Sequence, residues 1–219
     1  MAEGKFVTLN QQLYEYLVAH GHNGDPLLRE LADETARLGP ISGMQIAPEQ
    51  GTFMSLLAHV SGARHAIEIG TFTGYSAICV ARALPEDGTL LCCDVSEDWT
   101  AVARRYWEKA GLTERIRLKL GPAAETIRAL PAGETFDFAF IDADKINYRV
   151  YYEEVLRRLL PNGLILIDNV IWSGEVLNPR NQTDDTRAIR ELNDFLATDR
   201  RVEMVMLPVS DGLTICRKQ

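Results

Sequence analysis

Short apolar runs alternate with longer amphipathic stretches from residue 66 to the end of the chain. Seven of the runs predict β-strands, over residues 66–69, 89–94, 116–120, 136–141, 164–167, 202–207 and 213–216. Stretches of helical length separate the first five strands, over residues 75–84, 97–110, 124–130 and 148–160. Strands that alternate with helices in this way are typical of a doubly wound α/β sheet.

The make-up of individual strands predicts their direction. Residues 138–141 (FAFI) and 164–167 (LILI) are apolar at every position, as in parallel strands that helices cover on both faces. Residues 208–212 join the last two strands and end in Asp211-Gly212, a pair that favours a tight turn. We therefore predict a mostly parallel sheet of seven strands that ends in an antiparallel hairpin.

The first third of the chain predicts helices. Asp25 and Pro26 form a favourable helix start, because an acid can cap the first turn and proline fits within it. A link rich in glycine and proline, residues 39–51, leads to a second helix over residues 52–60.

Length and patterning indicate one domain. A chain of 219 residues can bury a large core without disulfides or structural metals. The sequence shows no internal repeat and no interdomain linker, so we predict a single domain over residues 1–219. Residues 1–62 would form its N-terminal helical segment and residues 63–219 its sheet.

Charge and cysteine content indicate which classes of partner and which cellular compartment to expect. The net charge of −8 gives nucleic acid no general electrostatic attraction. No apolar run reaches the about 20 residues that cross a bilayer, and the start of the chain lacks a signal-peptide pattern. Of the four cysteines, the adjacent pair Cys92 and Cys93 would point to opposite faces of a strand. We therefore expect buried, reduced thiols in a cytoplasmic protein without a membrane partner.

The turn after the first strand is a candidate nucleotide site. Glu68 lies in the strand, Gly70 and Gly74 lie in the turn, and a helix begins at Tyr75. This arrangement directs backbone amides to one point at the helix N-terminus. The dinucleotide fingerprint G-x-G-x-x-G is absent, since three residues separate the two glycines. Taken alone, the motif also fits an ordinary strand-to-helix turn.

Asp94 ends the second strand. A carboxylate at this place can accept hydrogen bonds from the hydroxyls of an adenosine ribose. An acid at a strand end can also cap the following helix, although Ser96 could take that role here. In combination with the first turn, we interpret Asp94 as a ribose ligand.

Acidic and amide side chains follow the fourth and fifth strands. Asp142 comes directly after one strand, and Asp168 and Asn169 come after the next. Two carboxylates and an amide oxygen suit a hard divalent cation, Mg²⁺ first of all. Helix capping is the alternative, but two adjacent carboxylates require a cation or a raised pKa. Lys145 lies three residues after Asp142 and could supply charge or act as a base.

Four motifs, in this order, resemble the small cation-dependent O-methyltransferases. They are GMQIAPEQG (residues 43–51), EIGTFTGYS (68–76), IDADKINY (141–148) and LILIDNVIWSGEV (164–176). The family includes catechol O-methyltransferase, the plant caffeoyl-CoA O-methyltransferases and bacterial relatives. The resemblance runs from about Met44 to the C-terminus.

The resemblance implies S-adenosylmethionine as cosubstrate and Mg²⁺ as metal, with Mn²⁺ or Ca²⁺ as alternatives. It assigns the cosubstrate to Met44, Glu68, Gly70, Thr71, Ser76, Asp94, Ala123 and Asp142. It assigns the metal to Asp142, Asp168 and Asn169, and the catalytic roles to Lys145 and Asp142. The expected reaction methylates one hydroxyl of a vicinal dihydroxyphenyl molecule, a small phenolic acceptor.

The acceptor side carries weaker signals. The N-terminal helices, which help to close the acceptor pocket in this family, show no pattern that matches it. Asn147, Tyr148 and Trp172 lie near the metal motifs and are candidates for the acceptor site. Trp172 fits a core position or a dimer contact equally well. A homodimer is expected from the resemblance alone.

Three other functions compete with this interpretation. A methyltransferase that acts on RNA would use the same methyl-transfer reaction, but the negative net charge of the chain argues against RNA binding. A nicotinamide oxidoreductase would need a different glycine spacing. A non-catalytic cofactor-binding partner would have no need of Asp142, Lys145, Asp168 and Asn169 together.

Overall fold

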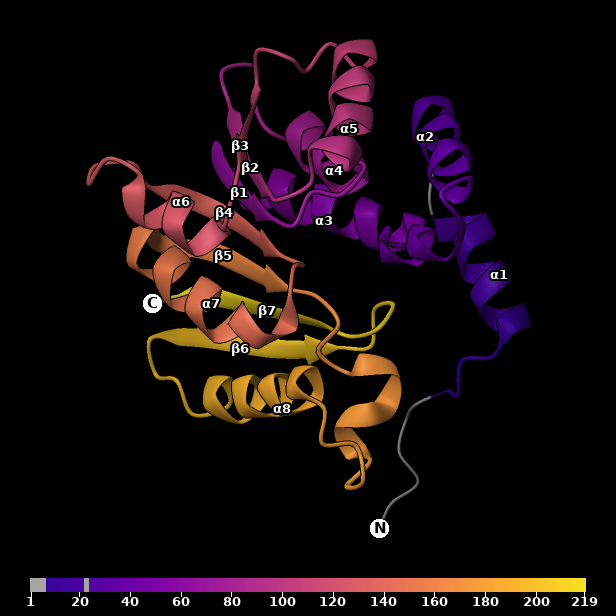
Figure 1. The fold of residues 1–219 in the computed structure, drawn as a ribbon, viewed down its shortest axis with the longest axis vertical. Coiled ribbons are helices and arrows are strands. Elements are labelled where there is room, and N and C mark those ends of the chain that lie inside the picture. Colours follow the sequence, from indigo (N-terminus) through magenta and orange to yellow (C-terminus); the bar gives the residue numbers. More distant parts are fainter. Residues whose placement is uncertain (1–6, 22–23) are drawn as a thin grey trace.

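The computed structural model describes residues 7–21 and 24–219 and confirms the predicted sheet (Figure 1). Its seven strands are β1 (His65–Ile69), β2 (Thr89–Asp94), β3 (Ile116–Leu120), β4 (Phe136–Ile141), β5 (Leu159–Ile167), β6 (Val202–Leu207) and β7 (Leu213–Lys218). They lie in the order β3-β2-β1-β4-β5-β7-β6. β1 to β5 are parallel, whereas β7 is antiparallel to both β5 and β6, as the predicted hairpin requires.

The boundary between α7 (Tyr148–Arg158) and β5 differs from the prediction. β5 begins at Leu159 rather than at residue 164, and the helix ends before residue 160. Leu159 pairs with Phe136 of β4, and the register shifts before Phe138. The pattern was misleading here because Leu159 and Leu160 continue the apolar spacing of the helix.

Helices cover both faces of the sheet (Figure 1). On one face, α4 (Tyr75–Ala83) and α5 (Glu97–Lys109) pack with α3 (Pro48–Val60) against alternate strand residues. On the other face lie α6 (Ala123–Ala129), α7 and α8 (Asp184–Leu196). Cys92 belongs to the first core and Cys93 to the second, which confirms their predicted opposition. All four cysteines are buried and free.

The N-terminal segment contains α1 (Gln11–Gly21), α2 (Pro26–Ala36) and the 3₁₀ helix η1 (Gly39–Met44) before α3. Residues 1–6 and 22–23 of the predicted segment lie outside the described residues. Asp25 caps α2 as predicted, since its Oδ1 accepts hydrogen bonds from the amides of Leu27 and Leu28 at 2.7 and 3.2 Å. In the described residues no helix has both the length and the apolar character needed to span a membrane.

α3 begins at Pro48, four residues earlier than predicted. Proline suits the first turn of a helix, and the helix then packs closely on α4 through Gly51. A Cβ at Gly51 would lie 2.8 Å from the Cys79 sulfur. The link that was predicted from its glycine and proline content is therefore partly helical, and it brings residues 48–51 next to the sheet.

α8 was missed by the sequence analysis, although its signals are present. Thr183 caps the helix by accepting the amide hydrogen of Thr186, and Ile189, Leu192 and Leu196 are buried. The 3₁₀ helix η3 (Trp172–Leu177) precedes it. Arg190 of α8 donates hydrogen bonds to four backbone carbonyls, at residues 175 and 176 of η3 and at residues 178 and 181 of the loop that follows it. These bonds fasten the loop to the helix.

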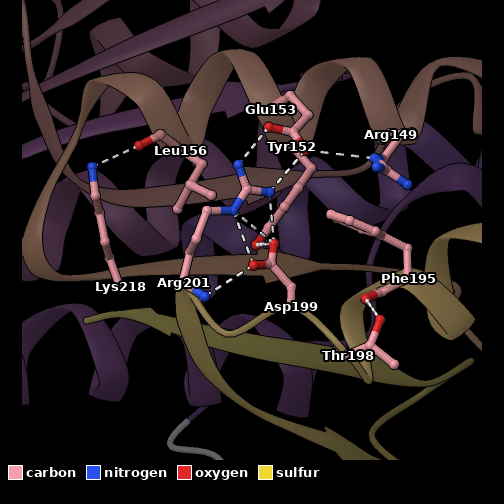
Figure 2. A network of polar contacts seen from close by, with 9 residues as sticks. All are labelled: Arg149, Tyr152, Glu153, Leu156, Phe195, Thr198, Asp199, Arg201 and Lys218. Carbon is pink, nitrogen blue, oxygen red and sulfur yellow. Dashed lines mark hydrogen bonds and ion pairs between the residues drawn. The ribbon is translucent and has the colours of Figure 1, made fainter.

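A second polar network joins α7 to the chain between α8 and β6 (Figure 2). The Arg201 guanidinium donates hydrogen bonds to the carboxylates of Glu153 and Asp199. The Tyr152 hydroxyl donates to Asp199 at 2.9 Å, and the Arg149 guanidinium lies over the Phe195 ring. This cluster ties the outer strand of the sheet to the helical layer.

Candidate active site

A cavity of about 890 Å³ lies at the carboxyl ends of β1, β2, β4 and β5. The strand order reverses between β1 and β4, and doubly wound sheets bind ligands at such a point. The predicted residues that line the cavity are Met44, Gly70, Thr71, Ser76, Asp94, Ala123, Asp142, Lys145, Asp168, Asn169 and Trp172. The fold thus brings most of the candidate side chains to one place.

The turn between β1 and α4 can approach β4 only because it contains glycine. Gly70 has a φ of 87°, and a Cβ at this residue would lie 1.8 Å from the Asp142 carbonyl oxygen. A side chain is therefore excluded by both the backbone conformation and the contact. The turn and the first candidate metal ligand are in direct backbone contact.

Asp94 fastens this turn to the end of β2. Its Oδ2 accepts hydrogen bonds from the amides of Thr71 and Phe72 at 2.8 and 2.9 Å, and its Oδ1 accepts the Ser96 amide at 2.8 Å. Ser96 caps α5 through its own hydroxyl, which accepts the Trp99 amide hydrogen at 3.2 Å. The capping alternative for Asp94 is therefore taken by Ser96, and the Asp94 carboxylate lies at the cavity wall.

Glu68 is placed differently from its neighbours. It is 1% exposed and is not among the residues that line the cavity. The Cys92 thiol donates to its Oε1 at 3.7 Å, and burial raises the pKa of the Glu68 carboxyl to about 8. The structure thus places Glu68 beside the glycine turn but outside the cavity wall.

Lys145 is held by three oxygen atoms. Its Nζ donates hydrogen bonds to Asp142 Oδ1 and the Ala143 carbonyl at 3.0 Å each, and to the Tyr148 hydroxyl at 2.5 Å. Three acceptors match the three donors of an ammonium group. The Lys145 residue is 8% exposed, and its Nζ lies 5.6 Å from the Trp172 ring centre. The Lys145 side chain is therefore held in one position in the wall of the cavity.

The donor set at the ends of β4 and β5 fits a hard divalent cation. Asp168 is 2% exposed, and burial together with the charge of Asp142 raises the pKa of its carboxyl well above the ordinary range. The Asn169 side chain has no hydrogen-bond partner among residues 7–21 and 24–219, so its oxygen is available as a ligand. Within the same residues no cluster of three or more His, Cys, Asp or Glu side chains has metal-site geometry, which leaves two carboxylates and one amide.

Gln50 contacts this donor set and was missed by the sequence analysis. Its Nε2 donates a hydrogen bond of 2.8 Å to Asp168 Oδ2 across 118 positions of sequence. Gln50 lies in the first turn of α3, within the motif GMQIAPEQG. The motif was noticed, but no local pattern shows that a residue in it reaches the end of β5.

The three acceptor-site candidates take different positions. Trp172 lines the cavity, whereas Asn147 and Tyr148 do not. Asn147 donates to the Asp144 carboxylate, and Tyr148 is fully buried below Lys145. The cavity wall also includes residues that sequence reasoning did not select, namely Tyr151, Asp185, Ser210 and Asp211. They come from α7, α8 and the hairpin loop, whose approach to the cavity depends on the tertiary fold.

Comparison with known proteins gives consistent matches over nearly the whole chain. A family model described as O-methyltransferase matches residues 19–219. The chain is 39% identical over 216 residues to a protein of Dictyostelium discoideum named "Probable caffeoyl-CoA O-methyltransferase 1", with 97% of this chain and 94% of the relative covered.

Solved structures share the same fold. An O-methyltransferase from Bacillus cereus in complex with SAH is 31% identical and has a TM-score of 0.86, with 94% of this chain and 96% of the other covered. The O-methyltransferase TomG of Streptomyces achromogenes, in complex with SAM, is 26% identical with a TM-score of 0.86, over 95% and 96% of the two chains.

Proposed function

Because this chain belongs to the O-methyltransferase family, we propose that it transfers the methyl group of S-adenosylmethionine to one hydroxyl of a small vicinal dihydroxyphenyl acceptor. The proposal includes a divalent cation, Mg²⁺ or alternatively Mn²⁺ or Ca²⁺. The observation that carries it is the meeting of Asp142, Asp168, Asn169 and Lys145 in the wall of a cavity that the Gly70 turn also lines.

The end of the cavity near β1 and β2 suits the cosubstrate. The Asp94 carboxylate would accept the ribose hydroxyls, while Gly70, Thr71 and Ser76 would surround the methionine end. Met44 would contribute an apolar contact there, and Ala123 would lie beside the adenine. The choice of cosubstrate is supported by the solved relatives in complex with SAH and with SAM.

The other end suits an acceptor with two neighbouring oxygens. Asp142, Asp168 and Asn169 would hold the cation, which when bound lowers the pKa of a phenol from about 10 and orients its oxygen. Lys145, in its neutral form beside that charge, would take the phenolic proton on Nζ. The oxygen forms a bond to the methyl carbon as the carbon–sulfur bond breaks, and the electron pair of that bond stays on sulfur. The residues of the chain contribute chiefly by holding the two reactants in line.

The charge of the cavity wall favours a small acceptor over a polyanion. Asp144, Asp185 and Asp211 line the cavity in addition to the acids already assigned, and Lys145 is the one basic residue of the described wall. An RNA or another polyphosphate would meet repulsion from these carboxylates. We further propose a cytoplasmic homodimer; the buried free thiols suit a reducing compartment, and light scattering after size exclusion tests the dimer.

The deciding experiment is transfer of labelled methyl from S-adenosylmethionine to a panel of catechols, namely caffeate, 3,4-dihydroxybenzoate and a dihydroxyphenylalanine. Each is assayed with Mg²⁺ and then with EDTA, and caffeoyl-CoA is included as an anionic acceptor. Turnover that EDTA abolishes is the expected result. Turnover that survives EDTA would remove the metal from the mechanism, and binding of the cosubstrate without transfer to any catechol would remove the acceptor class.

A further inference from the structure

Gln50 is the polar link between the N-terminal helical segment and the candidate metal ligands. Its residue is 0% exposed, and its Nε2 lies 2.8 Å from Asp168 Oδ2. A buried polar side chain without a structural or functional partner is rare, because its desolvation must be offset by hydrogen bonds. Here the partner of the buried amide is a predicted ligand.

The Asp168 carboxylate receives one donor on each oxygen. Gln50 donates to Oδ2, and the Asn169 backbone amide donates to Oδ1 at 2.7 Å. Two donors on different oxygens oppose rotation of the carboxylate about its Cβ–Cγ bond. The Asn169 amide belongs to the backbone just after β5, so Gln50 is the side chain that completes this restraint.

The orientation of the Gln50 amide is determined by its surroundings. A carboxylate accepts hydrogen bonds and does not donate when ionised, so the NH₂ group faces Asp168. The Gln50 Oε1 is buried and has no hydrogen-bond partner in the part of the chain that the structure describes. Glutamine therefore gives up one hydrogen bond on its oxygen to keep the donor directed at Asp168.

The donor is also neutral, which matters for a site that would bind a cation. A lysine or arginine in this place would neutralise Asp168 and repel a divalent ion. An amide orients the carboxylate and leaves its negative charge for the metal. Groups that hold a ligand in this way commonly change metal affinity by about 10- to 100-fold when they are removed.

We infer that Gln50 is a positioning residue that holds Asp168 in its metal-binding orientation. Through this bond, the packing of α3 on the sheet affects the affinity for the metal. The inference rests on the proposed metal-dependent function. η1, α3 and the intervening residues also bring Met44 and Ile46 to the cavity wall. The N-terminal segment thus contributes to both the wall of the cavity and the order of the metal ligands.

The test measures binding of Mn²⁺ to the full chain without cosubstrate, by the electron paramagnetic resonance signal of the free ion. Gln50→Met keeps the length of the side chain and removes the donor; Gln50→Asn keeps the donor and shortens its reach. Both variants should raise the Kd for Mn²⁺ by about 10- to 100-fold. The Kd for S-adenosylhomocysteine should stay unchanged.

Met54→Ala is the matched control. Met54 is fully buried one turn further along α3, and it makes no hydrogen bond to Asp168. It should lower the melting temperature and leave the Kd for Mn²⁺ unchanged. Equal loss of Mn²⁺ binding in Met54→Ala, or wild-type affinity in a folded Gln50 variant, would overturn the inference alone. Absence of Mn²⁺ binding in the wild-type chain would overturn the proposed metal and, with it, this role of Gln50.

Discussion

The two ends of the cavity are lined by different chemical groups. Near β1 and β2, the glycine turn offers backbone amides, and Asp94 binds two of them at 2.8 and 2.9 Å. Near β4 and β5, the wall consists of charged side chains, and Asp168 depends on a partner 118 positions away. The first end is assembled mainly from neighbouring loops, with Met44 as a contact from the N-terminal segment, whereas at the second end the orientation of a carboxylate depends on α3.

This difference implies separable losses of function. A substitution at the turn should lower the affinity for the cosubstrate first, because Asp94 both accepts the backbone amides of the turn and is the proposed ligand of the ribose. Damage at the acidic end should affect the cation and the acceptor first. The two ends meet where Gly70 contacts the Asp142 backbone. If a variant at one end leaves ligand binding at the other end unchanged, the two ends are separate in spite of this contact.

The largest effect is expected from Asp168→Ala. Loss of a ligand to the cation should lower Mg²⁺-dependent methyl transfer by about 10³-fold, in the range seen when a group that stabilises developing charge is removed. Affinity for S-adenosylhomocysteine, measured by calorimetry, should remain within a few fold. Asp185→Ala, which removes another acid of the same wall, is the control. Equal loss of cosubstrate binding in Asp168→Ala would show that the two ends are not separate.

Asp94→Ala should have the opposite profile. The variant removes the acceptor of two turn amides and the proposed ribose ligand, and hydrogen bonds to a charged group contribute about 1.5–3 kcal/mol each. We expect the affinity for S-adenosylmethionine to fall by about 100-fold, which calorimetry would detect. The Kd for Mn²⁺ should not change, and a parallel loss of metal binding would contradict the comparison.

Tyr148→Phe should produce a smaller change that is confined to turnover. The variant removes the hydroxyl 2.5 Å from Lys145 Nζ and leaves the buried ring in place. One neutral hydrogen bond contributes about 1 kcal/mol, so kcat should fall by roughly fivefold while KM and the Kd for Mn²⁺ stay constant. Tyr151→Phe, on the neighbouring turn of α7, serves as the control. An unchanged kcat would mean that Lys145 needs no restraint from Tyr148.

Arg201→Met should lower stability and leave both ends of the cavity intact. Arg201 is half exposed, so its ion pairs contribute about 1 kcal/mol or less to the free energy of unfolding. Hydrogen bonds from Arg201 are the main cause that lowers the pKa of Asp199 to about 2. The contribution is therefore complete above about pH 4 and is lost as the pH falls through 2. Urea unfolding would show a larger difference in the free energy of unfolding between variant and wild type at pH 7 than at pH 2.5.

Much of the sheet follows from local sequence, because each strand carries its own apolar run and each turn its own glycine or acid. The carboxyl-terminal ends of β1, β2, β4 and β5 were predicted to the residue. Hence Asp94, Asp142 and Asp168 could be expected at one edge. The start of β5 could not, since Leu159 fits a helix and a strand equally well until its pairing with Phe136 is known.

The parts of the site that escaped prediction are those that depend on distant segments. Gln50 has an ordinary position in a helix start, and only the packing of α3 shows what it contacts. Asp185 and Asp211 reach the cavity from α8 and the hairpin loop. Glu68 shows the reverse case, since its place beside the glycine turn suggested the cavity wall and the pleat of β1 puts it underneath.

The four carbonyls that Arg190 holds have a consequence for how this enzyme could diversify. Trp172, Ser173 and Asp185 reach the cavity from a stretch whose intervening loop is fastened by one side chain of α8. Residues 172–190 therefore contain these cavity residues together with the side chain that holds the chain between them. Exchange of this whole stretch between relatives should alter acceptor preference and preserve folding, whereas a shorter graft that omits position 190 would inherit the new loop without its fastening.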